Sequence, residues 1–88
     1  MLEDPLVRAR VQTLIDDGTL PRRPPIQMWG GPGSGRHCTI CERPILAEDL
    51  EFELEVHEGP RGRRAVLHVQ CFAAWDVARP GDRGTAPR

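Results

Sequence analysis

The sequence predicts a small α+β domain in a single chain of 88 residues. Three patterns predict this class: an amphipathic helical period before Gly18, a strict alternation of apolar and acidic residues from Leu50 to His57, and helix-forming residues from Val69 to Arg79. A chain this short buries a modest share of its surface on folding, so we expect an additional constraint on the fold.

The first expected element is an amphipathic helix within residues 1–18. Asp4 followed by Pro5 is typical of a helix N-cap with proline in the first helical position. Apolar residues then recur at helical spacing, at Val7, Val11, Leu14 and Ile15. An isolated helix of about three turns is only marginally stable in water. We therefore expect this stripe to pack on the rest of the chain, with a second copy or another protein as the alternative.

A proline- and glycine-rich linker is expected in residues 19–37, because no helical or strand period is visible there. It contains three large apolar residues, Ile26, Met28 and Trp29. These residues either pin the linker to the folded module or form an exposed recognition segment.

The same linker partly matches the pattern of a phosphate-binding loop. The spacing Gly30-x4-Gly35 is that of such a loop, but Arg36 and His37 stand where a Lys and a Ser or Thr are required. The sequence therefore does not favour phosphate binding.

A third region, residues 38–80, is expected to hold a β-hairpin and a helix. The alternation from Leu50 to His57 predicts a half-buried strand with Glu51, Glu53 and Glu55 on its solvent face. Residues 58–64 predict a turn, residues 65–68 a second strand, residues 69–79 a helix and residues 81–88 a frayed tail. The expected core consists of Phe52, Leu54, Val56, Leu67, Phe72 and Trp75.

Two pairs of metal-binding residues flank this hairpin in the pattern C-x2-C-x26-H-x2-C: Cys38 with Cys41, and His68 with Cys71. Residues three apart share one face of a helix, and a tight turn brings the members of C-x-x-C together. Three thiolates and one imidazole fill the tetrahedral shell of a structural Zn²⁺ ion and leave no open position for catalysis. We therefore expect one structural zinc ion and no enzymatic activity.

The cysteines and histidines also allow other interpretations. A thioredoxin-like C-x-x-C opens a helix after a buried strand, whereas Cys38 follows a glycine-rich run. Unliganded structural cysteines are a further alternative, and three cysteines cannot all pair in a disulfide framework. His37 and His57 are expected to be exposed polar residues rather than ligands. A nuclease site of the HNH type would have a catalytic His at the end of a strand, followed by an Asn and a second metal-binding His. That arrangement is not found in the sequence.

The pattern of Cys38, Cys41, His68 and Cys71 resembles that of the treble-clef zinc finger. In that family a knuckle supplies the first two ligands, a hairpin follows, and the first turn of a helix supplies the last two. The pattern is also similar to the first half of a LIM domain, although the 26-residue spacer is long and a second site is absent. The whole chain resembles small uncharacterised bacterial zinc-finger proteins. All 12 basic residues are arginine and none is lysine, a composition that suggests a GC-rich genome.

The net charge of -1 gives no long-range attraction to nucleic acid or to an anionic membrane. No membrane-spanning run and no secretory signal are found, so we expect a cytoplasmic protein with no membrane partner. We expect a protein-interaction module or adaptor whose partner is another protein. The alternative is a nucleic-acid-binding zinc finger that uses arginines of the hairpin turn and of the linker, namely Arg61, Arg63, Arg64, Arg22, Arg23 and Arg36.

Overall fold

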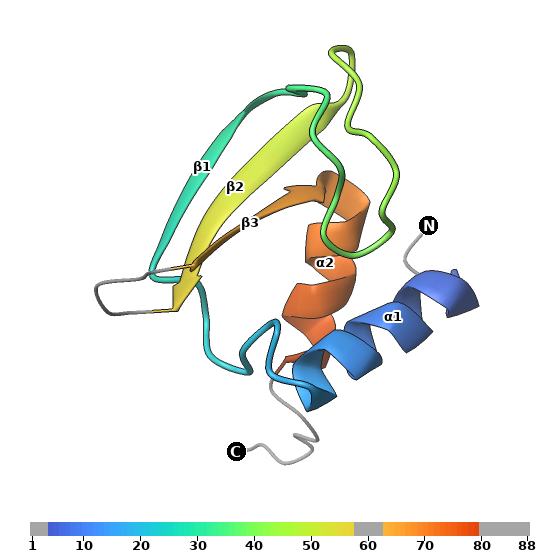
Figure 1. The fold of residues 1–88 in the computed structure, drawn as a ribbon, viewed down its shortest axis with the longest axis vertical. Helices are drawn as coiled ribbons and strands as arrows, with labels where there is room; N and C mark the ends of the chain where they lie inside the picture. Colours follow the sequence, from blue (N-terminus) through green and yellow to red (C-terminus); the bar gives the residue numbers. More distant parts are fainter. Residues whose placement is uncertain (1–3, 58–62, 80–88) are drawn as a thin grey trace.

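A computed structural model of the chain describes residues 4–57 and 63–79, and of His57 and Arg63 only the backbone. The elements in chain order are α1 (Pro5–Asp16), β1 (Gln27–Pro32), β2 (Leu50–His57), β3 (Arg63–His68) and α2 (Val69–Ala78). The strands form one antiparallel sheet in the order β1-β2-β3, and α2 lies between this sheet and α1 (Figure 1). The α+β class is confirmed.

Helix α1 begins and packs as its sequence predicts. The side chain of Asp4 accepts a hydrogen bond from the backbone N–H of Leu6 (2.9 Å), and Pro5 occupies the first helical position. The apolar stripe is buried, and α1 packs against α2. The docking partner of α1 is therefore the rest of its own chain.

Strand β1 corrects the expectation of an irregular linker. Residues 27–32 pair with β2 along their whole length, from Gln27 opposite Glu55 to Pro32 opposite Leu50. Ile26, Met28 and Trp29 remain 43%, 43% and 41% exposed, so the expectation that burial of these side chains pins the linker is wrong. Backbone pairing with an existing strand holds the segment instead, although its glycines and prolines have low intrinsic strand propensity.

The upstream half of the linker is attached to α2 rather than to the sheet. Leu20 is buried in the core, and the indole Nε1 of Trp75 donates a hydrogen bond to the Pro21 carbonyl (3.0 Å). This bond satisfies the polar atom of an otherwise buried aromatic side chain.

Strand β2 occupies the predicted residues, but its two faces differ from the prediction at one end. Leu50 is 50% exposed and Glu51 only 6% exposed, the reverse of what the alternation predicts. The reason is tertiary, because the segment from Gly33 to Arg36 crosses the start of β2 and covers the carboxylate. Further along the strand, Leu54 and Val56 are buried as expected.

The core contains most of the predicted residues and several others. Leu54, Val56, Leu67 and Trp75 are buried, whereas Phe52 and Phe72 are partly buried and meet edge to face with ring centroids 5.1 Å apart. The buried apolar residues outside the expected core come from α1, from the connecting segments, from β3 and from α2; they are Val7, Val11, Leu14, Ile15, Leu20, Ile40, Ile45, Ala65, Val66 and Ala74.

The turn of the β2–β3 hairpin and the ends of the chain include residues that the structure does not describe. Of the turn predicted at residues 58–64, residues 58–62 lie outside the described residues, as does the predicted tail at residues 81–88. Arg63 and Arg64 belong to β3, which begins two residues before the predicted strand because these residues pair with β2. Helix α2 ends at Ala78, one residue before the predicted end. Within the described ranges, neither helix is long and apolar enough to span a bilayer.

Candidate metal centre

The structure brings Cys38, Cys41, His68 and Cys71 into one cluster. One potential ligand atom from each residue lies within 4.8 Å of all the others. Tetrahedral Zn²⁺ with bonds of about 2.0 to 2.3 Å would separate its ligand atoms by about 3.3 to 3.8 Å. The farthest pair therefore has to close by about 1 Å around such an ion. The four residues fit a Cys3His metal site.

The first two residues of the cluster come from a tight turn, residues 38–43, which we call the knuckle. The Cys38 carbonyl accepts a hydrogen bond from the Glu42 N–H (2.9 Å), and the Cys38 N–H donates to the Arg43 carbonyl (2.9 Å). The Ile40 N–H points at Cys38 Sγ at 3.4 Å, which favours a thiolate there. Glu42 has φ of 69°, a left-handed conformation that closes the turn.

The other two residues come from the junction of β3 and α2. His68 ends β3 and is the N-cap of α2, and Cys71 lies in the first turn of α2. Both side chains are buried, and His68 Nδ1 lies 3.4 Å from Cys41 Sγ. The knuckle is held beside this junction by a hydrogen bond from the Thr39 N–H to the Val66 carbonyl of β3 (2.9 Å).

The side chains of Cys38 and Cys71 are hydrogen-bonded to each other. A hydrogen bond from Cys71 lowers the pKa of Cys38 to about 4 against the opposing effect of burial, and backbone N–H groups of the knuckle act in the same direction. The pKa of Cys71 is raised, first because Cys38 holds its proton in that bond and second because burial disfavours a second thiolate. A metal ion would displace the proton of this hydrogen bond, since thiolates are the species that bind metal.

Two arginines near the cluster were not singled out from the sequence. The guanidinium of Arg43 lies beside Cys41, and its hydrogen bond to the Cys41 side chain raises the pKa of Arg43 above its ordinary value. A bound Zn²⁺ with three thiolates carries one net negative charge, which Arg43 is placed to offset. The available signal was a basic residue two positions after the C-x-x-C pair.

Arg10 of α1 attaches the helix to the knuckle. Its Nε donates to the Ile40 carbonyl (3.0 Å), and its Nη2 forms an ion pair with Glu42 (2.9 Å). Sequence patterns gave no signal for this contact, because the two segments lie about 30 residues apart and Arg10 is one of several polar residues on the helix.

The two histidines that were expected to lie outside the site have different outcomes. His37 is exposed and outside the cluster, and its backbone forms an isolated β-bridge with Pro44. The side chain of His57 lies outside the description, so its expected exposure stays a prediction.

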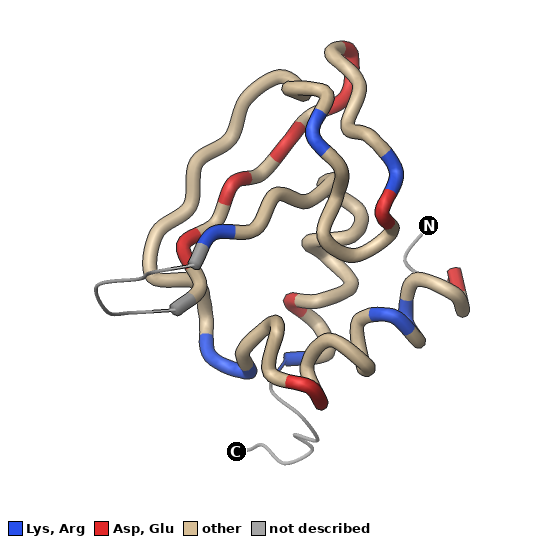
Figure 2. Tube along the Cα trace, in the orientation of Figure 1, with Lys and Arg blue, Asp and Glu red and all other residues tan. Residues whose placement is uncertain are grey.

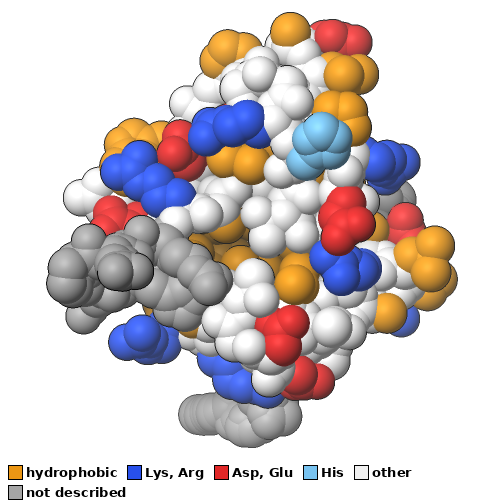
Figure 3. All heavy atoms as spheres, in the orientation of Figure 1, with side chains coloured by type: hydrophobic (Ala, Val, Ile, Leu, Met, Phe, Trp, Pro, Cys, Tyr) orange, Lys and Arg blue, Asp and Glu red, His pale blue; other side chains and the backbone are white. Residues whose placement is uncertain are grey.

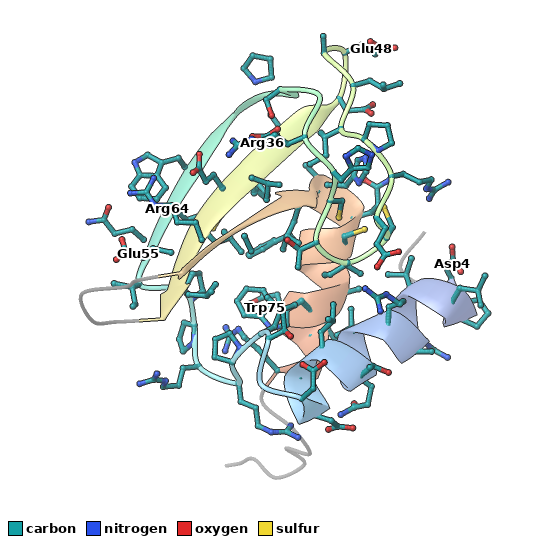
Figure 4. All side chains as sticks on the ribbon, viewed as in Figure 1. Asp4, Arg36, Glu48, Glu55, Arg64 and Trp75 are labelled. Carbon is teal, nitrogen blue, oxygen red and sulfur yellow. The ribbon has the colours of Figure 1, made fainter. Side chains whose placement is uncertain are left out.

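Access to the cluster comes through surface hollows between α1, the knuckle and the start of α2. One hollow of about 240 Å³ contains Cys41 in its wall, and its other lining residues are Asp4, Leu6, Val7, Arg10 and Arg43. In Figure 4 the sulfur atoms lie between the knuckle and the start of α2, on the side of α2 that faces Asp4. The half-buried Cys41 is therefore accessible to an ion from outside.

A carboxylate clamp positions the segment that leads into the knuckle. Glu51 accepts hydrogen bonds from the N–H and the Oγ of Ser34 (2.9 and 2.7 Å) and an ion pair from Arg36 (2.8 Å). Burial alone raises the pKa of Glu51, but these bonds outweigh burial and hold the pKa below its ordinary value. The clamp comprises Ser34, Arg36 and Glu51.

Comparison with known proteins adds no family to this geometry. Neither the family models nor the curated proteins nor the solved structures contain a significant match to the chain.

Proposed function

We propose that this chain is a zinc-binding protein in which Cys38, Cys41, His68 and Cys71 hold one structural Zn²⁺ ion. The observation that carries the proposal is the convergence of these four side chains from two distant segments. Three sulfur donors and one imidazole suit Zn²⁺ better than hard cations, which prefer oxygen. The order of knuckle, β2, β3 and α2 supports the resemblance to the treble-clef finger.

Metal reconstitution tests the proposal. The purified chain should bind one equivalent of Zn²⁺, and Co²⁺ in its place should give the visible absorption of a tetrahedral thiolate site. His68→Asn should weaken binding at least tenfold, whereas the matched variant His37→Asn should bind as the wild type does. Binding that depends on His37 rather than on His68, or an octahedral cobalt spectrum, would refute the proposed ligand set.

With four protein ligands the ion has no open coordination position, so we propose no catalytic role for it. We propose instead that the folded module acts by binding another protein. Ile26, Met28 and Trp29, on and beside β1, support this role, because exposed large apolar side chains are typical of interaction sites. Figure 3 shows basic and acidic side chains interspersed over the visible face, without a large patch of one sign.

Nucleic-acid binding is the weaker proposal, because three of the arginines that it uses are paired with carboxylates. Arg22 lies 3.6 Å from Asp16. Arg64 lies 3.3 Å from Glu53, and Arg36 lies 2.8 Å from Glu51 and 3.3 Å from Glu53. Figure 2 shows the acidic run of β2 between these two basic positions. Arg61 and the side chain of Arg63 lie outside the described residues.

Chromatography of the chain on immobilised DNA and RNA distinguishes the protein-binding role from the nucleic-acid-binding role. A protein-interaction module should elute from both at low salt, and Arg64→Ala should change nothing. Steeply salt-dependent retention that Arg64→Ala and Arg63→Ala reduce would establish the nucleic-acid role instead.

A further inference from the structure

Strand β1 forms an open edge of the sheet in the part of the chain that the structure describes. At the opposite edge, β3 receives the hydrogen bond from Thr39 of the knuckle. No described segment pairs with the outer side of β1, which Figure 1 shows at the border of the molecule. An open strand edge presents unpaired backbone groups to any other strand that approaches it.

The register identifies which backbone groups are free. Gly33 continues the register of β1 and donates its N–H to the Asp49 carbonyl (2.9 Å). Bonded and non-bonded pairs alternate along an antiparallel ladder, so Gly31 and Trp29 also direct their N–H and C=O groups toward β2. The backbone N–H and C=O groups of Met28 and Gly30 therefore point outward, away from β2.

The side chains of this edge lack the usual protection against strand addition. Natural edge strands carry charged residues that oppose pairing, yet no charged residue occurs between Ile26 and Gly35. Met28 and Trp29 are large, apolar and exposed. Pro32 ends the strand and has no N–H, which limits pairing to the residues before it.

The neighbouring charges do not oppose a second copy. Arg64 lies over the Trp29 ring at 4.7 Å from the centroid and pairs with Glu53, which is opposite Trp29 in β2. Glu53 and Glu51 are both paired with Arg36. Two copies that approach through β1 therefore bring together locally compensated charges.

We propose that β1 binds β1 of a second copy of this chain in antiparallel orientation, with the two-fold axis at Trp29. Met28 of each copy then exchanges both backbone hydrogen bonds with Gly30 of the other. The large Met28 side chain faces a residue without a side chain, and the two Trp29 side chains lie directly opposite each other in a close, non-bonded pair. The result is a continuous sheet through both copies. This inference depends on β1 and not on the proposed metal.

Association through one short strand is weak, because the buried area falls at the low end for specific interfaces. We expect a dissociation constant on the order of 100 µM. In sedimentation equilibrium of the zinc-loaded chain, the mass should rise from 9.9 kDa toward twice that value as the concentration increases from about 10 µM to about 1 mM.

A charge swap at the axis tests the geometry. Trp29→Glu alone and Trp29→Lys alone should each stay monomeric, because like charges then face each other across the axis. An equimolar mixture of the two should associate again, which also shows that both variants fold. The control Val77→Lys, at a position on α2 that is 73% exposed, should associate as the wild type does.

A second measurement needs no variant. In the wild type, hydrogen exchange of the Met28 and Gly30 amides should slow as the concentration rises, whereas the Gly35 amide, outside the strand, should not change. A wild type that stays monomeric at about 1 mM overturns the proposal and leaves the edge to an extended segment of another protein. Association that persists in either charged variant alone, or that the mixture fails to restore, overturns it as well.

Discussion

The loop between β1 and β2, residues 33–49, is attached to the rest of the molecule at two places by different chemistry. In the clamp, Glu51 at the start of β2 binds the nearby Ser34 and Arg36. In the knuckle, Cys38 and Cys41 meet His68 and Cys71, which follow about 30 residues later. The charge of Glu51 in the clamp is balanced by groups of the protein itself. The cysteines of the knuckle instead need a cation to balance the charge of their thiolate forms. We therefore expect the two attachments to contribute very unequal free energies.

Metal removal should have the largest effect. Structural zinc adds apparent binding free energy of about 10 to 16 kcal/mol, more than the net stability of a typical domain. A chelator, or Cys71→Ser, should therefore unfold the module from Cys38 to Arg79. The measurement is amide NMR dispersion before and after metal removal, with His37→Asn as the variant that leaves the spectrum native. Native dispersion in the metal-free chain would show that the clamp and the core suffice without the cation.

Gly33→Ala should destabilise the protein by about 3 kcal/mol through a backbone clash. A Cβ atom at Gly33 would overlap the carbonyl oxygen of Leu46, in the second half of the same loop. Gly31→Ala is the matched control, since a Cβ there meets nothing within 4 Å. Denaturant unfolding of the zinc-loaded variants gives both values. Equal stability of the two variants would mean that the backbone of Gly33 does not lie as close to the backbone of Leu46 as the structure shows.

Glu51→Gln should cost about 2 kcal/mol. The amide keeps one acceptor for Ser34 but loses the charge that holds Arg36, and a buried polar group is left poorly satisfied. Glu48→Gln is the control, because Glu48 is exposed. The free energies of unfolding of both variants test this prediction, and a cost that is the same for Glu48→Gln as for Glu51→Gln would contradict it.

The pH dependence of the same variant tests the direction of the pKa shift. Because the pKa of Glu51 is lowered in the folded chain, its contribution is complete above the ordinary pKa of about 4.3 and is lost as the pH falls through the folded value. The stability difference between wild type and Glu51→Gln should therefore stay constant from pH 7 to pH 5. A difference that already shrinks in this range would indicate a raised pKa.

Glu42→Gly should have the smallest effect, a stabilisation of at most about 1 kcal/mol. Glycine adopts the left-handed conformation of this position without strain, and the lost ion pair with Arg10 is exposed and contributes little. Glu42→Ala loses the same ion pair and keeps the strain, so it should be less stable than the wild type. Thermal unfolding of the two zinc-loaded variants gives the comparison, and Glu42→Gly less stable than Glu42→Ala would exclude strain at this position.

Local patterns predicted the elements whose signal lies within their own residues. The bounds of β2, and those of both helices to within about two residues, followed from periodicity and from the capping and turn residues around them. The grouping of Cys38, Cys41, His68 and Cys71 followed from two short spacings that match a tight turn and a helix. The presence of zinc, the adaptor role and the cytoplasmic location remain proposals.

The sequence by itself determined the amphipathic stripe of α1, the alternation of β2 and the two ligand pairs, because these depend on geometry that repeats within a few residues. Only the tertiary structure decided that residues 27–32 form a strand, that Glu51 is buried and that Arg10 reaches the knuckle. The physical reason is that each of these features depends on a partner distant in the chain. A strand rich in glycine and proline forms when another strand offers hydrogen bonds, and a carboxylate can be buried when donors from a crossing loop bind it.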